Sequence, residues 1–404
     1  MKIAGRILIA YLMLTLLFTG VLTAVFCIPR SAIEDNVRQS VHQVADEGPR
    51  FTTRLGLLEP FKLGSFSDCL ILGIAYCADS DHPLPSAMNA TFPAKDGSPV
   101  LGARLMMETP GNEALQPVIY SRYWHGNQVI IRPLLCFTTV KGIRLLNIVL
   151  LGGLLVSLGV VMWRRVNRAD ALIMTLCLTA VMIPSVPLCL NYVPPFYIAL
   201  ISSLLILLWP HANSRWINTV TLFFVIGGVT AFFDLLTTPM IAMAIPVMVY
   251  ILYRKPERPC RTVVLLSLAW LAGYASLWAT KWLLAMVITG HTAIQDAMGA
   301  VTQRTVGHNE QEYMLWCLKM TSIALIAVAT VTATIAVTFN RSRQALRDNF
   351  WMLLIAMSSF VWAFVLLEHT WHHLHFTWRT FTVLAIGVLL YLRHSINLTP
   401  SKRL

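Results

Sequence analysis

The sequence predicts an all-α polytopic protein that crosses a membrane about ten times. Of its 404 residues, 56% are hydrophobic and only 12% are charged, which is about half the charged share of a soluble domain. Apolar runs of about 20 residues recur and are continuous, whereas the strands of a membrane barrel alternate polar with apolar residues. The net charge of +12 gathers at the ends of these runs, so it indicates membrane orientation and no nucleic-acid partner.

Residues 1–29 are predicted to form the first transmembrane helix. Lys2 and Arg6 precede an apolar run from Ile7 to Ile28. This run is longer than the hydrophobic part of a signal peptide, and no small-residue cleavage site follows it. We therefore expect an uncleaved helix with a cytoplasmic N-terminus.

Residues 30–142 are predicted to form an extracytoplasmic loop domain. Four apolar residues near its start recur at helical spacing and indicate a helix that lies on the membrane or extends the first span. These residues are Ile33, Val37, Val41 and Val44. Ser31, followed three residues later by Glu34, fits a capping box at the start of that helix.

Two of the eight cysteines, Cys69 and Cys77, lie in this loop domain, eight residues apart. They pair as a disulfide if the domain faces an oxidising compartment, and otherwise stay free thiols. The other cysteines lie in or near apolar runs, where a thiol behaves as a small apolar side chain. No cysteine spacing resembles a zinc site.

Residues 143–404 are predicted to form a transmembrane helix bundle with short cytoplasmic loops. Nine further spans fit the apolar runs, and their exact number between residues 195 and 253 is open. They cover about residues 145–163, 171–190, 195–209, 217–233, 240–253, 263–288, 314–339, 350–367 and 380–392. This layout places sixteen Lys and Arg residues but only three acids on the cytoplasmic side, as the positive-inside rule predicts.

The remaining polar residues collect on the outer side, which indicates one site there. Residues 120–133 bring two arginines, a histidine and three aromatic residues to the start of the second span, either as part of that site or as an interfacial anchor. Asp234 follows an apolar run at the membrane boundary, where an acid is costly, so it is either functional or the cap of the next span. We expect a shared outer cavity. Its predicted lining is Arg122, His125, Asp234, Arg304 and Arg379.

Several of these side chains can bind a phosphate group or transfer a proton. A guanidinium binds phosphate oxygens in fork geometry, which favours Arg122, Arg304 and Arg379 as phosphate ligands. His372 and His375, three residues apart, either bind a metal ion or donate to an anionic headgroup. Further site candidates share an outer position and a polar or aromatic side chain. They are Glu34, Trp124 and Asp296.

Four motifs together resemble a family of uncharacterised bacterial polytopic membrane proteins. The first is an arginine–aromatic–His–Gly stretch that ends in Arg-Pro-Leu-Leu, here residues 122–135. The second is an Asp-Leu-Leu-Thr-Thr-Pro turn at residues 234–239. The third is a Thr-Gly…Asp-Ala…Arg-Thr loop at residues 289–305, and the fourth is a histidine-rich stretch that ends in Phe-Thr-Trp-Arg at residue 379.

In overall design this family is similar to the GT-C glycosyltransferases, which carry an acidic catalytic residue in a large first outer loop and use polyprenyl-phosphate sugars. The resemblance implies a transferase of the bacterial cytoplasmic membrane with an outward-facing site. Asp68 or Asp35 would be the general base, with His125 as the alternative. The partners would be the lipid-linked donor, membrane lipid and a glycan, glycolipid or protein acceptor. A divalent metal ion is the one cofactor left open.

Two other functions fit the same sequence. A lipid or glycolipid transporter or flippase would use Asp234 as a coupling acid, although the two halves of the chain show no inverted repeat. A membrane-embedded acyl- or phosphotransferase would use the histidine-rich stretch instead.

Overall fold

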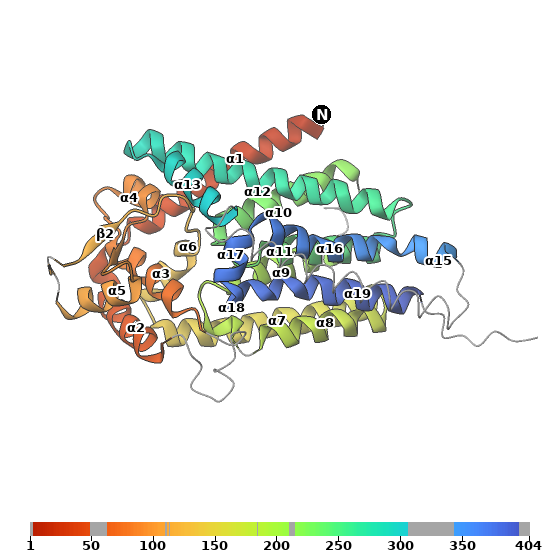
Figure 1. Cartoon of the computed structure of the whole chain (residues 1–404), viewed down its shortest axis with the longest axis horizontal. Coiled ribbons are helices and arrows are strands. Elements are labelled where there is room, and N and C mark those ends of the chain that lie inside the picture. Colours follow the sequence, from red (N-terminus) through yellow and green to blue (C-terminus); the bar gives the residue numbers. More distant parts are fainter. Residues whose placement is uncertain are drawn as a thin grey trace, which may run out of the picture.

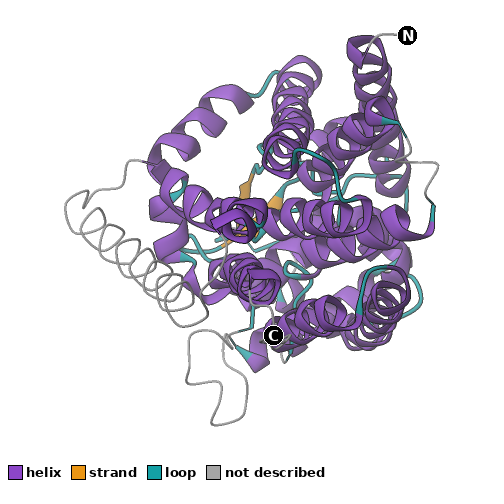
Figure 2. Ribbon diagram, turned by 90° about the vertical axis from the view of Figure 1, so that its right-hand side faces the viewer, coloured by secondary structure: helices purple, strands orange, loops and turns teal. Residues whose placement is uncertain are grey.

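The computed structural model describes residues 3–48, 63–109, 111–112, 114–183, 185–209, 215–305 and 343–395. Long helices run side by side along the molecule, and a smaller group of short helices covers one end of them (Figure 1). Viewed along the bundle, most helices appear end-on, with the two short strands behind them (Figure 2).

Five helical segments of the described chain are long and apolar enough to cross a membrane. They are α1 (Ile3–Phe26), α7 (Val140–Arg165), α10 (Trp216–Phe233), α12 (Pro259–Thr289) and the segment Leu374–Ser395, which contains α18 (Leu374–Thr377), η6 (Trp378–Phe381) and α19 (Thr382–Ser395). The predicted class of an all-α membrane protein is confirmed at this level.

Shorter helices occupy most of the other predicted spans. They are α8 (Arg168–Met182), α9 (Val193–Leu208), α11 (Pro239–Arg254) and α16 (Phe350–Val365), with α15 (Arg343–Asp348) ahead of the last. The third span was expected to continue to Leu190, but α8 ends at Met182, and η4 (Val186–Leu188) follows. Pro184 explains this end, because a proline disfavours helical geometry in the residue before it. The predicted span at 314–339 lies outside the described residues.

The loop domain is a cluster of short helices with one two-stranded sheet. Its elements are η1 (Arg30–Ala32), α2 (Glu34–Glu47), α3 (Ser65–Cys77), α4 (Pro83–Asn89), β1 (Phe92–Ala94), α5 (Pro99–Glu108), β2 (Gln116–Val118) and α6 (Gln128–Leu135). The strands are antiparallel, with Phe92 opposite Val118. The domain lies at the end of the bundle where α7 begins (Figure 1).

The helix predicted from apolar spacing near residue 33 is confirmed as α2. Its four apolar residues Ile33, Val37, Val41 and Val44 are all buried. The predicted capping box is wrong, because Ile33 is the N-cap and no side chain caps the helix. Ser31 instead lies in the η1 turn that follows Pro29, so α2 begins only at Glu34.

The disulfide alternative for Cys69 and Cys77 is also wrong. Both residues lie on α3 and both are free thiols. Eight residues of α-helix separate their Cα atoms by roughly 12 Å, and a disulfide spans less than about 7 Å.

Contacts between distant segments define two ends of the bundle. At the end away from the loop domain, Arg6 donates to Asn218, Arg165 donates to the carbonyl of Leu207, and Arg393 pairs with Asp170 at 2.9 Å. At the loop-domain end lie α13 (Ala293–Thr305) and α17 (Leu367–His372) (Figure 1). Arg6, Arg165 and Arg393, which are predicted to be cytoplasmic, therefore lie at the opposite end of the bundle from the loop domain, α13 and α17.

Helices α10 and α12 approach each other through glycines. A Cβ on Gly227 would lie 1.9 Å from the carbonyl oxygen of Trp270, and one on Gly273 would lie 2.0 Å from that of Phe224. Only glycine leaves room for this backbone contact, which is a common way for membrane helices to pack.

We expect Gly273→Ala to lower the thermal stability of the detergent-solubilised protein. The added methyl group must push α10 and α12 apart, and overpacking of this kind costs about 1–3 kcal/mol. Gly153→Ala in α7 is the matched control, since no atom lies within 4 Å of its added Cβ. Equal melting temperatures for the two variants would contradict the close packing.

Candidate functional site

Asp68 lies in the first turn of α3 with none of its surface exposed to solvent. Its backbone N–H donates to the carbonyl of Gly64 at 2.8 Å, and its carboxylate lies 3.7 Å from Arg144 of α7. Within the described ranges, neither carboxylate oxygen has a hydrogen-bond partner of normal geometry. A buried carboxyl without such partners is costly, and this indicates a functional position.

Among the described residues, Arg144, one turn into α7, is the charged group that pairs with Asp68. Its Nη2 lies 3.7 Å from Oδ2 of Asp68, while its Nη1 donates to both oxygens of Glu47 at 2.9 and 2.7 Å. Burial raises the pKa of Asp68 to about 7; Arg144 and the backbone N–H groups of Leu190 and Asn191 lower it, and Glu47 raises it. Asp68 therefore changes its charge close to neutral pH, as a general base requires.

The segment between α8 and α9 closes the other side of Asp68. Gly64 N donates to Cys189 Sγ at 3.2 Å. Burial raises the pKa of the Cys189 thiol, Asp68 raises it further, and Arg379 and Arg144 lower it. Asp68, Arg379 and Arg144 thus all affect the pKa of the Cys189 thiol.

Arg379, which belongs to η6, lies beside Tyr192 and near Cys189. Its guanidinium lies 4.6 Å from the centroid of the Tyr192 ring, donates to the carbonyl of His375 at 2.9 Å and bonds to Ser185. We call Asp68, Arg144, Glu47, Cys189, Tyr192 and Arg379 the Asp68 site. It joins the loop domain to three separate parts of the bundle.

A polar pocket of about 790 Å³ opens beside this site. It is lined by Glu47 and Gln43 of α2, by Lys141 and Arg144 at the start of α7, and by the hydroxyl-bearing residues Thr138 and Thr139, together with apolar side chains. Two cations, hydroxyl groups and the first turn of a 26-residue helix favour an anionic group here.

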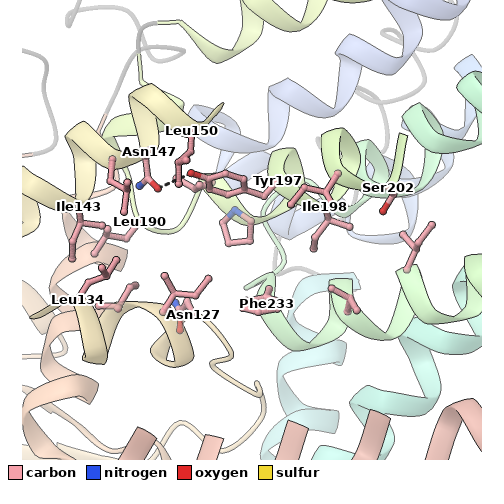
Figure 3. Close-up of a pocket in the computed structure, with 18 of the residues that line it drawn as sticks. Asn127, Leu134, Ile143, Asn147, Leu150, Leu190, Tyr197, Ile198, Ser202 and Phe233 are labelled. Carbon is pink, nitrogen blue, oxygen red and sulfur yellow. Dashed lines mark hydrogen bonds between the residues drawn. The ribbon is translucent and has the colours of Figure 1, made fainter. Parts of the chain in front are cut away.

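An apolar pocket of about 490 Å³ lies along another face of α7. Aliphatic side chains of α6, α7, α9 and α10 line most of it, and Asn127 and Asn147 are among its few polar lining residues (Figure 3). Tyr197 donates a hydrogen bond to Asn147 Oδ1 at 3.1 Å. Leu190 belongs to this lining and is also one of the two residues whose backbone N–H groups lower the pKa of Asp68, so it separates the pocket from the Asp68 site.

The stretch at residues 120–133 forms a separate cluster. Arg122 pairs with Asp296 of α13 at 3.0 Å, and its guanidinium lies 4.4 Å from the centroid of the Tyr120 ring. Nε2 of His125 bonds to the carbonyl of Tyr120 at 3.0 Å, and burial lowers the pKa of His125 to about 3. A proton acceptor this weak suits a general base at neutral pH poorly.

Asp234 ends α10 and holds the following turn. Its carboxylate accepts the backbone N–H of Thr237 at 3.1 and 3.2 Å and the hydroxyl of the same residue. The neighbouring carbonyl of Leu236 bonds to Nε2 of His369 in α17 at 2.7 Å. The expectation that Asp234 caps the next span is wrong, because Thr238 is the N-cap of α11 and no side chain caps that helix; Asp234 instead stabilises the turn between α10 and α11.

The other predicted residues are scattered. Asp35 is exposed on α2, and Glu34 pairs with Arg38 at 3.2 Å. Trp124 is buried and donates to the carbonyl of Leu277 at 2.8 Å, as a core residue would. Arg304 and His372 lie in α13 and α17, and their side chains fall outside the described part of the structure.

Neither of the two pockets described above is lined by Asp68, Arg122, His125, Asp234 or Arg379; Asp68 is next to the polar pocket only through Arg144. The ring of His375 lies 6.0 Å from that of His373. Among the described residues, no three His, Cys, Asp or Glu side chains are grouped closely enough to hold a metal ion.

Sequence reasoning missed Glu47, Arg144, Cys189 and Tyr192. For Arg144 a signal existed: it lies with Lys141 at the predicted outer end of a span, where the positive-inside rule expects few cations. Nothing in the local sequence marks the other three, because their partners come from elements far along the chain.

Comparison of the chain with protein-family models, curated proteins and solved structures finds no match.

Proposed function

We propose that this protein is a membrane glycosyltransferase that moves a sugar from a polyprenyl-phosphate donor to a glycan, glycolipid or protein acceptor. One observation carries the proposal. Asp68, an acid whose pKa is raised to about 7, is buried between the loop domain and the bundle beside Arg144, with a polar pocket and an apolar pocket adjoining.

In this proposal Asp68 accepts the proton of the acceptor hydroxyl as that oxygen attacks the anomeric carbon. The bond from that carbon to the phosphate oxygen breaks, and the polyprenyl phosphate leaves with the electron pair. Arg144 stabilises the charge that develops on the phosphate, and Lys141 binds it from the rim of the polar pocket. Arg379 supports the site from behind Tyr192.

The apolar pocket suits the first part of the polyprenyl chain. Its lining is almost entirely aliphatic, and it borders α7 on another face from the polar pocket. A lipid phosphate could therefore place its chain along one face of α7 and its head at the first turn of that helix. Asn147, bonded to Tyr197, gives the apolar pocket one of its few polar groups.

The proposal includes about ten spans, a GT-C-like outer loop and a place in the bacterial cytoplasmic membrane with the site facing outward. The separation of the basic ends from the Asp68 site supports this orientation.

Sugar transfer in membranes that contain the overexpressed protein tests the function directly. Membranes supplied with radiolabelled polyprenyl-phosphate sugars should transfer label into lipid-extractable or polymeric product above the level of membranes without the protein. No transfer from a panel of such donors would refute the proposal. Movement of labelled lipid across vesicles of the purified protein would then favour the flippase function.

The orientation makes a separate prediction. In a variant whose reactive cysteines are replaced, a membrane-impermeant maleimide should label a cysteine placed at Ser98 in the loop domain and miss one placed at Asn167. Ser98 caps α5, and Asn167 precedes α8 at the opposite end of the bundle. The reverse pattern would place the Asp68 site on the cytoplasmic side.

A further inference from the structure

Arg144 lies between two carboxylates but is hydrogen-bonded to only one of them. Glu47, the last residue of α2, receives two bonds from Nη1, at 2.9 and 2.7 Å. Asp68 is 3.7 Å from Nη2, which is too long for a hydrogen bond. The side chain of Glu47 is 27% exposed and that of Asp68 is 1% exposed.

Glu47 is itself held in place. Nε2 of Gln43, one turn earlier on α2, donates to its Oε1 at 2.8 Å. Both residues line the polar pocket with Arg144. A group in this pocket therefore contacts the Glu47–Arg144 pair, whereas Asp68 is buried next to Arg144 and does not line the pocket.

We propose that Glu47 is a positioning residue: by holding Arg144, it keeps that guanidinium from forming a tight ion pair with Asp68, so that Asp68 remains able to take up a proton. The role of Glu47 in catalysis rests on the proposed function. Its effect on the pKa of Asp68 does not depend on that function.

The charges around Asp68 give the direction of the effect. Arg144 of α7 and Glu47 of α2 act on it directly, and the backbone N–H groups of Leu190 and Asn191 add to the effect of Arg144. Among the residues that the structure describes, the other titratable groups nearby are Cys69, Cys189, Tyr192 and, through the last two, Arg379.

Loss of the Glu47 charge lowers the pKa of Asp68 in two ways. It removes a negative charge that raises the pKa of Asp68, and it frees Arg144 to move closer, which lowers that pKa further. An opposite charge in direct contact typically lowers a carboxyl pKa by about one to three units. The ionised form of Asp68 should therefore persist to lower pH in Glu47→Gln.

The first readout is the pH profile of sugar transfer. A base must be ionised to act, so wild-type activity should rise with pH through about 7. In Glu47→Gln this rise should move to lower pH by about one unit or more, with a lower plateau because the ionised base is weaker. A purely structural role for Glu47 would lower the plateau and leave the midpoint unchanged.

The second readout needs no activity. The carbonyl stretch of protonated Asp68 can be followed in infrared difference spectra across pH, with Asp68→Asn subtracted to remove other buried acids such as Asp234. The pH at which half of Asp68 is protonated should be lower in Glu47→Gln than in the wild type. Asp46→Asn is the matched control, because this neighbouring acid of α2 pairs with Arg104, at 3.2 Å, and its loss should leave the midpoint unchanged.

Glu47→Asp covers the case in which Glu47→Gln does not fold. The shorter side chain keeps the charge but reaches Arg144 less well, so its midpoint should lie below that of the wild type. An unchanged infrared midpoint in a folded Glu47 variant, or an equal shift in Asp46→Asn, would overturn the inference. A shifted midpoint in a protein that transfers no sugar would support the inference and refute the proposed function.

Discussion

Asp68→Asn should lower the rate of sugar transfer by a factor on the order of 10² to 10⁴ while the protein stays folded. The amide keeps the shape of the carboxyl but cannot accept the proton of an acceptor hydroxyl. The backbone N–H groups of Leu190 and Asn191, which lower the pKa of Asp68, can also face an amide oxygen, so the amide fits the same surroundings. Binding of the lipid-linked donor should change little, because Arg144 and the polar pocket remain.

Asp35→Asn is the matched comparison for this prediction. Asp35 is the other acid that the sequence suggests as the base, and it is exposed on α2. We expect its variant to keep nearly full transfer activity. Initial rates at saturating donor, together with equilibrium binding of the donor lipid, separate loss of chemistry from loss of binding. Full activity in Asp68→Asn would exclude Asp68 as the base.

The sequence predicts the membrane helices well because each depends on a local property. A run of apolar residues long enough for the bilayer is visible without knowledge of its neighbours, so α1, α7, α10 and α12 fall close to their predicted ranges. Their ends are less predictable. The early end of α8 depends on a proline and on the turn that follows it.

The candidate site is predictable only in part, because it depends on pairs that are far apart in the chain. Asp68 stands out locally as an acid at the entry to an apolar run. Its environment comes from Arg144, which lies 76 positions later, and from Tyr192 and Arg379 beyond that. No local pattern joins these residues.

The arginines illustrate the same limit. Composition alone suggests that Arg122 binds phosphate, yet it pairs with Asp296, which lies 174 positions away. Arg132, in the same stretch, attracted no functional interpretation of its own. In the structure it is fully buried and bonds to backbone carbonyls of two helices. A charge in a hydrophobic context predicts that a partner exists but does not identify it.

Arg132 leads to the second large expected effect, which is on stability. Its Nε donates to the carbonyl of Val25 at 2.9 Å, and its two terminal nitrogens donate to those of Ala75 and Ile28. These carbonyls lie at or just beyond the C-terminal ends of α1 and α3, where a positive charge is favoured; that of Val25 also accepts the backbone N–H of Ile28 at 3.3 Å. The Arg132 side chain thus connects α1, the first span, to α3 of the loop domain by hydrogen bonds.

Arg132→Met should therefore lower the free energy of unfolding by about 3 kcal/mol or more, because each buried carbonyl left without a donor costs about 1–3 kcal/mol. Arg132→Lys should lie between this variant and the wild type, since an ammonium group keeps the charge but matches three separate carbonyls less well than the guanidinium. Arg104→Met is the control: Arg104 is half exposed and pairs with Glu108 at 2.9 Å, an arrangement worth about 1 kcal/mol at most. Thermal or denaturant unfolding in detergent would rank the three variants. If Arg132→Met were no less stable than Arg104→Met, the buried guanidinium would not be what joins α1 to α3.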